Sequence, residues 1–130
     1  MEKKGSICII DDDRIFVFGT RKIMKKIGFK GDLIVYNNGQ DAVEGLTEMS
    51  QENKKLPSLI LLDLNMPIMN GWEFLEEYKK IPLGQKNGVT LYIMSSSVDP
   101  IDCERAKSYT EVKNYILKPV TPQDLDKIIR

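Results

Sequence analysis

The feature that most constrains the fold is a regular alternation of short apolar runs with longer amphipathic segments. Five runs have the length and apolar content of buried strands: SICII (6–10), DLIVY (32–36), SLILL (58–62), VTLYIM (89–94) and KNYIL (113–117). Apolar residues at helical spacing follow each run, from residue 16 to 27 and then at about 39–52, 71–81, 99–108 and 122–130. Five successive strand–helix units predict an α/β fold with a parallel sheet. The segment LGQKNG (83–88) is expected to be a loop.

Length, charge and cysteine content narrow the class of protein. The chain has 130 residues, the size of one domain, and we expect a single unit over residues 1–130. Its 19 basic residues balance 19 acidic ones, so no basic excess exists for the phosphates of a nucleic acid, and direct nucleic acid binding is not expected. Cys8 and Cys103 form no Cys-x-x-Cys pair, which is typical of reduced thiols in a cytoplasmic protein. No apolar run is long enough for a signal peptide or a membrane span, so no membrane association is expected.

The sequence contains no histidine, which leaves carboxylates, hydroxyls and amines as its reactive groups. Ser-His-Asp catalysis, histidine metal ligands and a role as phosphohistidine donor are therefore excluded. In an open α/β sheet, ligands bind beyond the carboxyl ends of the strands, so the polar residues at these ends should meet. Carboxylates with an amine and a hydroxyl suit a hard cation such as Mg²⁺ and a phosphoryl group. The residues at these ends are Asp11, Asp12, Asp13, Asp63, Ser95, Ser96, Ser97 and Lys118.

Simpler interpretations compete for several of these residues. Asp13 directly precedes a helix, where an N-cap is a better interpretation than a ligand, so we leave it out of the site. An adjacent pair such as Asp11 and Asp12 is common in solvated turns and proves little alone. The serines at 95–97 are also typical of a strand-to-loop capping cluster, which is the better interpretation for at least two of the three.

Asp63 and Lys118 are harder to explain as ordinary surface residues. Asp63 follows the apolar run LILL, and an ionised carboxylate buried there is costly without a cation. Lys118 follows NYIL and precedes Pro119, which restricts the lysine backbone and so directs its amine. Tyr115, inside the last strand, is expected to be a half-buried aromatic.

Four motifs together resemble the receiver domain of two-component response regulators, in particular the free-standing chemotaxis-type regulators. They occur in order at the ends of the expected strands: IIDDD (9–13), LLDLNMPIMNGWEFL (61–75), YIMSSS (92–97) and YILKPVTPQDL (115–125). The resemblance covers nearly the whole chain and implies a flavodoxin-like, doubly wound fold, with a five-stranded parallel sheet of order 2-1-3-4-5 flanked by five helices. Asp11 and Asp12 form the acidic pair, because the helix ending at 27–29 then aligns with the family without a gap.

The resemblance also implies a phosphorylation site. Asp63 would take a phosphoryl group from the phosphohistidine of a sensor histidine kinase or a histidine phosphotransfer protein, forming an aspartyl phosphate. Asp12, Asp63 and the backbone carbonyl of Asn65 would bind Mg²⁺ directly, and Asp11 would act through a bound water. Phosphoryl transfer depends mainly on positioning and on neutralising charge, which fits this set of residues. The chain would be a phosphoacceptor regulator that catalyses only its own phosphorylation and dephosphorylation, and not an enzyme with a separate substrate.

The remaining implied roles concern the phosphoryl group and the signal. Lys118 would pair with one phosphoryl oxygen and Ser95 would donate a hydrogen bond to another. Tyr115 would then rotate inward and change the face formed by residues 99–108, 113–117 and 122–130, which would bind an unidentified output protein. Position 95 is serine where the family often has threonine, so we expect looser switching. Since the chain ends with the fifth helix, output is expected through protein contacts or onward phosphotransfer.

Two residues next to the site are expected to set the lifetime of the phosphoryl group. Asn65 and Ser97 each lie two residues beyond a site residue, and Asn65 is the better placed to orient a water molecule.

Two other functions compete with the receiver hypothesis. An aspartate-nucleophile phosphatase of the haloacid dehalogenase type would need a second aspartate where Asn65 stands and a longer chain. A receiver-like module that binds partners without phosphorylation would normally lack part of the acidic pair, the aspartate or the lysine, and none is missing here.

Overall fold

The computed structural model describes residues 5–129 as one parallel sheet flanked by helices. Five strands pair in the order β2-β1-β3-β4-β5, all parallel, which confirms the expected order. The strands are β1 (Ile7–Ile10), β2 (Leu33–Tyr36), β3 (Leu59–Leu62), β4 (Thr90–Ser95) and β5 (Val112–Leu117). Every residue of β1 and β3 is buried, as the continuous apolar runs of central parallel strands require.

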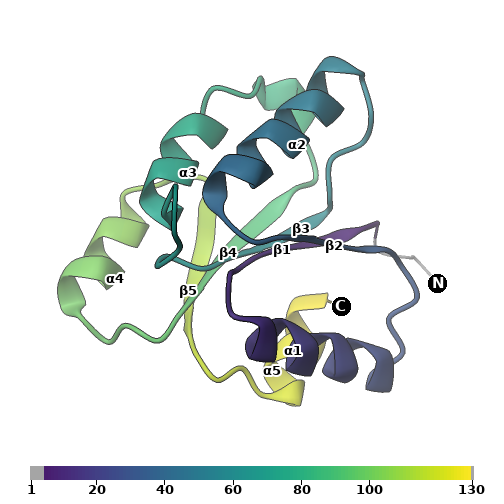
Figure 1. Cartoon of the computed structure of the whole chain (residues 1–130), viewed down its shortest axis with the longest axis vertical. Helices are drawn as coiled ribbons and strands as arrows, with labels where there is room; N and C mark the ends of the chain where they lie inside the picture. Colours follow the sequence, from purple (N-terminus) through teal and green to yellow (C-terminus); the bar gives the residue numbers. More distant parts are fainter. Residues whose placement is uncertain (1–4, 130) are drawn as a thin grey trace.

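The helices cover both faces of the sheet (Figure 1). Two of them, α1 (Arg14–Lys26) and α5 (Pro122–Ile129), pack on one face over a cluster that includes Ile7, Ile9 and Leu125. The other three lie on the opposite face: α2 (Gly39–Gln51), α3 (Gly71–Tyr78) and α4 (Pro100–Lys107). The two hydrophobic clusters fix the sheet between its helices, so the loops at the strand ends are held on a rigid frame. No helix within residues 5–129 is long and apolar enough to cross a membrane.

Side-chain caps set the helix starts that flank the strand ends. Asp13 accepts from the N–H groups of Ile15 and Phe16, so its carboxylate caps α1, which is the role expected from the sequence. Asn70 forms a capping box with Glu73 at the start of α3.

The helix ends and one loop differ from expectation. Helix α3 was expected to reach about residue 81 but ends at Tyr78. The amides of Lys80 and Ile81 then donate to carbonyls three residues earlier, a tighter turn than the α-helix, and Pro82 has no N–H with which to continue the helix. Residues 83–88 were expected to be a loop, yet Leu83–Lys86 forms a 3₁₀ turn, η1. The Lys86 ammonium donates to the carbonyl of Tyr78 at 3.2 Å, so this turn folds back onto the end of α3.

Candidate functional site

Three carboxylates from two neighbouring strands meet at one edge of the sheet. Asp11 and Asp12 directly follow β1, and Asp63 directly follows β3, the strand that pairs with β1. One carboxylate oxygen from each of the three lies within 4.8 Å of the others. Asp11 and Asp63 are only 2% and 7% exposed, whereas Asp12 is exposed to solvent. The structure therefore brings together the acidic residues that the sequence placed in the site.

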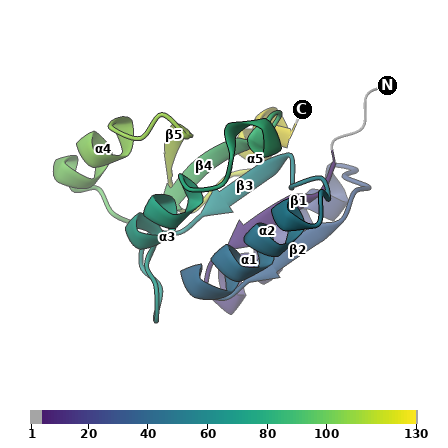
Figure 2. The same cartoon turned by 90° about the horizontal axis from the view of Figure 1, so that it is seen from above.

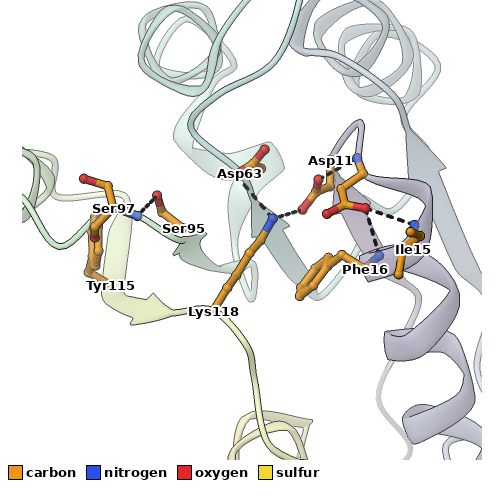
Figure 3. A network of polar contacts seen from close by, with 9 residues as sticks. Asp11, Ile15, Phe16, Asp63, Ser95, Ser97, Tyr115 and Lys118 are labelled. Atoms are coloured by element: carbon orange, nitrogen blue, oxygen red, sulfur yellow. Dashed lines mark hydrogen bonds and ion pairs between the residues drawn. The ribbon is translucent and has the colours of Figure 1, made fainter.

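Lys118 lies between the two buried carboxylates (Figure 3). It follows β5, and its ammonium is 2.7 Å from Asp11 Oδ2 and 3.5 Å from Asp63 Oδ1. The aliphatic stem runs toward α1, where the ammonium lies 4.2 Å from the centre of the Phe16 ring. Packing against an aromatic face restricts a long, flexible side chain, so Phe16 helps to hold Lys118 at the site.

The positive charge near the two buried carboxylates is too small to neutralise both of them. Burial and the neighbouring charge of Asp11 raise the pKa of Asp63 from 3.8 to about 6, although Lys118 opposes that rise. Burial also raises the pKa of Asp11, even though Lys118 hydrogen-bonds to it. One ammonium is therefore shared between two carboxylates that are both disfavoured in their ionised form. A divalent cation would relieve this imbalance.

The residues present fit a hard divalent cation. The donor set is oxygen only, with three carboxylates close enough to share one ion, and Asp12 is open to solvent so that bound waters could complete the shell. Asn65 is exposed in the loop after β3, and its backbone carbonyl accepts no hydrogen bond from residues 5–129. The acidic triad is thus able to bind a divalent metal.

Ser95, Ser97 and Tyr115 form a second polar group beside Asp63 (Figure 3). Ser95 ends β4 and is fully buried, and its Oγ accepts from the N–H of Ser97 at 3.0 Å. Tyr115, in β5, is half-buried, and its hydroxyl donates to the carbonyl of Ser97 at 3.0 Å. Ser96 is exposed and takes no part in this group. The resemblance singled out Ser95 among the three serines, and the structure connects Ser95 with Ser97.

Two residues of this region escaped the sequence analysis. Phe16 was assigned to the apolar face of the first helix, and helical spacing gives no sign of its contact with Lys118. Asp102, in α4, accepts from the Ser97 hydroxyl at 2.7 Å. Its position in the first turn of a predicted helix is a common place for an acidic residue and carried no signal.

Comparison with known proteins agrees with this geometry. Residues 7–130 match the family model described as response regulator receiver domain. The chain is 28% identical over 125 residues to the response regulator Rcp1 of Synechocystis sp., with 95% of this chain and 83% of that protein covered. Other curated relatives are longer: the chain spans 54% of the nitrate/nitrite response regulator NarL of Escherichia coli and 8% of the histidine kinase mak1 of Schizosaccharomyces pombe.

Solved structures share the fold. The crystal structure of a two component response regulator from Cytophaga hutchinsonii superposes with a TM-score of 0.86 at 31% identity, covering 98% of this chain and 95% of that one. The Mn²⁺-bound form of response regulator Rcp1 superposes with a TM-score of 0.74 at 25% identity, covering 95% and 88% of the two chains.

Proposed function

The chain belongs to the response regulator receiver family, a family of phosphoacceptor signalling modules, and from this premise we propose that Asp63 accepts a phosphoryl group from phosphohistidine. The observation that carries the proposal is the burial of Asp63 beside Asp11 and the Lys118 ammonium. A carboxylate with a pKa near 6 is ionised at neutral pH, so it is available as a nucleophile.

The transfer exchanges one bond to phosphorus for another. A carboxylate oxygen of Asp63 attacks the phosphorus atom, the new O–P bond forms, and the N–P bond of phosphohistidine breaks. The leaving imidazole keeps the electron pair of the broken bond, and it leaves as neutral imidazole when its other ring nitrogen carries a proton in the donor. The product is a mixed anhydride of a carboxylic and a phosphoric acid. The donor histidine lies outside this sequence, which has no histidine, and a sensor histidine kinase or a histidine phosphotransfer protein would supply it.

Two side chains and a bound cation would position the phosphoryl oxygens. Lys118 moves its charge from the carboxylates to one phosphoryl oxygen, a short displacement because its ammonium is already 3.5 Å from Asp63. Ser95 donates its hydroxyl proton to another oxygen. Mg²⁺ held by Asp12, Asp63 and the Asn65 carbonyl, with Asp11 acting through water, would supply positive charge against the developing negative charge.

The face around α4 and β5 is proposed to carry the output. Its exposed apolar side chains are Val98, Ile101 and Leu117, which are 75%, 73% and 48% exposed. Apolar side chains gathered on one solvent-facing surface favour a protein partner. Tyr115 lies in β5 beneath this face, so its rotation would alter the surface that the partner meets.

Incubation with acetyl phosphate and Mg²⁺ tests the proposal. We expect a base-labile acyl phosphate at one equivalent per chain, located at residue 63 by mass spectrometry, and no label in Asp63→Asn. Asp13→Asn is the matched control: it removes a carboxylate from the same acidic run while asparagine retains a strong helix cap, so it should label as wild type does.

Other outcomes would favour the competing functions. Turnover of many equivalents of acetyl phosphate would favour a phosphatase. No label in the wild-type chain would favour a binding module that works without phosphorylation. Labelling that persists in Asp63→Asn would refute the assignment of the phosphoacceptor.

A further inference from the structure

Helix α4 is held to the rest of the molecule by few apolar contacts. Of its eight residues, only Ala106 is buried, whereas the equally long α3 buries four. Figure 2 shows α4 at the outer end of the molecule, and Figure 1 shows the same from the other direction. With so little apolar surface buried, its position depends on polar and aromatic contacts at its two ends.

The N-terminal end of α4 is tied to the loop after β4 through Ser97. The Ser97 hydroxyl donates to Asp102 Oδ2 at 2.7 Å, a short bond to a charged acceptor. The same oxygen accepts from the N–H of Asp99, the N-cap residue of α4, at 3.2 Å. Ser97 therefore fixes both the cap and the first turn of the helix.

The backbone of Ser97 is tied to the phosphorylation site. Its N–H donates to Ser95 Oγ at 3.0 Å, and its carbonyl accepts from the Tyr115 hydroxyl at 3.0 Å. Since Ser95 uses an acceptor lone pair in this bond, its hydroxyl proton remains available, and no acceptor for that proton lies within residues 5–129. Ser97 thus connects Ser95, Tyr115 and α4 in one hydrogen-bonded unit.

The C-terminal end of α4 is attached through aromatic side chains. Tyr109, just after the helix, stacks on Trp72 of α3 with ring centres 5.9 Å apart, and its hydroxyl donates to Glu76 at 2.7 Å. The Arg105 guanidinium of α4 lies 4.5 Å from the centre of the Trp72 ring. Trp72 is the one tryptophan of the sequence, so its fluorescence reports on the position of α4.

We propose that Ser97 is a positioning residue whose bond to Asp102 latches α4 in the unphosphorylated protein and is released when Ser95 turns toward a phosphoryl group on Asp63. The release follows from the bonding at Ser97. When Ser95 Oγ moves toward the site, the N–H of Ser97 must follow it or lose its acceptor. If Ser97 follows Ser95, its hydroxyl is drawn away from Asp102. If its N–H loses the acceptor, the backbone that holds the hydroxyl against Asp102 is no longer fixed. In both cases the bond to Asp102 weakens, and α4, which buries only Ala106, loses the contact that holds its first turn. The inference rests on the proposed function only for the trigger, since the latch itself exists without phosphorylation.

Hydrogen exchange of the α4 amides in the unphosphorylated full chain tests the latch. Ser97→Ala and Asp102→Ala should each speed exchange within residues 103–107 by about tenfold, the scale of one hydrogen bond to a charged group. The double variant should exchange no faster than the faster single variant, because both changes remove the same bond. Ser97→Thr keeps a hydroxyl and should restore slow exchange. Ser96→Ala changes the exposed neighbouring serine and should behave as wild type, and amides of α2 should exchange alike in all variants.

The trigger is tested with beryllofluoride and Mg²⁺, which imitate the phosphoryl group. In wild type they should speed α4 exchange and change Trp72 emission, and in Ser97→Ala they should add little to an exchange rate that is already high. Unchanged α4 exchange in Ser97→Ala, or additive effects in the double variant, would overturn the latch. Labelling of the wild-type chain by acetyl phosphate is measured in parallel, so that absence of a label at Asp63 counts against the proposed function, whereas unchanged α4 exchange in Ser97→Ala and Asp102→Ala counts against the latch.

Discussion

Replacing Asp63, the proposed phosphoacceptor, should make the metal-free protein more stable at neutral pH. Burial and the charge of Asp11 raise the pKa of Asp63 from 3.8 to about 6. A difference of about two pKa units corresponds to about 3 kcal/mol, by which ionised Asp63 destabilises the fold. Asparagine has nearly the same shape and carries no charge. Asp63→Asn should therefore raise the free energy of unfolding at pH 7.5 by about 1–3 kcal/mol, the lower figure allowing for the lost contact with Lys118.

The pH dependence of this gain follows from proton binding. Below about pH 4, Asp63 holds its proton in both the folded and the unfolded chain and contributes no difference. Between about pH 4 and pH 6, the unfolded chain loses the proton while the folded chain keeps it, so stability falls as pH rises. Above about pH 6 the Asp63 carboxyl is ionised in both the folded and the unfolded chain, so the destabilisation has reached its full size. The advantage of Asp63→Asn should thus grow from near zero at pH 4 to its full size by pH 7. The raised pKa of Asp11 acts in the same direction and remains in the variant.

Urea unfolding at several pH values, with EDTA present, measures this difference. Asp13→Asn is again the control, because it removes one carboxylate close by but preserves the cap of α1, and it should follow the wild-type curve. If Asp63→Asn is no more stable than wild type at pH 7.5, or if its advantage does not change with pH, the electrostatic account of the site is wrong.

Three further predictions concern the metal, the switch and the lifetime of the phosphoryl group. Mg²⁺ should raise the melting temperature of wild type, while Asp12→Ala should be more stable without metal and respond less to Mg²⁺; an equal response would argue against the site. Under beryllofluoride and Mg²⁺, amide shifts should spread from Asp63 to residues 99–118 and shrink in Ser95→Ala, and equal spread would remove Ser95 from the switch. Asn65→Met should slow phosphate loss several-fold after donor removal without lowering the extent of labelling. A time course of phosphate loss at saturating Mg²⁺ measures this, and equal rates in wild type and Asn65→Met would contradict the prediction.

The fold was predictable because its signals are local. Continuous apolar runs such as LILL in β3 specify buried central strands, and Asp13 and Gly28 mark the ends of α1. The errors occurred at the end of α3 and in the segment that follows it. The helix gives way to tighter i→i−3 bonds just before Pro82, and the expected loop contains a 3₁₀ turn whose Lys86 contacts the carbonyl of Tyr78.

The site was predictable to the extent that strand ends define it. Asp11, Asp63, Ser95 and Lys118 each follow or end a strand, so a parallel sheet brings them to one edge whatever the loops do. The sequence could not predict which of the two buried carboxylates the Lys118 ammonium would contact more closely. The 2.7 Å contact of Lys118 with Asp11, rather than with Asp63, depends on side-chain packing against Phe16.

Ser97 illustrates the limit of an inference from spacing. Its place two residues beyond Ser95 suggested a side chain at the edge of the phosphoryl site, but spacing does not say which neighbour the hydroxyl meets. In the structure the Ser97 hydroxyl donates a hydrogen bond to Asp102, which lies in the following helix, α4. A hydroxyl bound in this way is not free to hold a water molecule in line with Asp63. We therefore expect the phosphoryl lifetime to depend more on Asn65, whose exposed side chain has no such partner among residues 5–129, and we expect Ser97 to act on the position of α4.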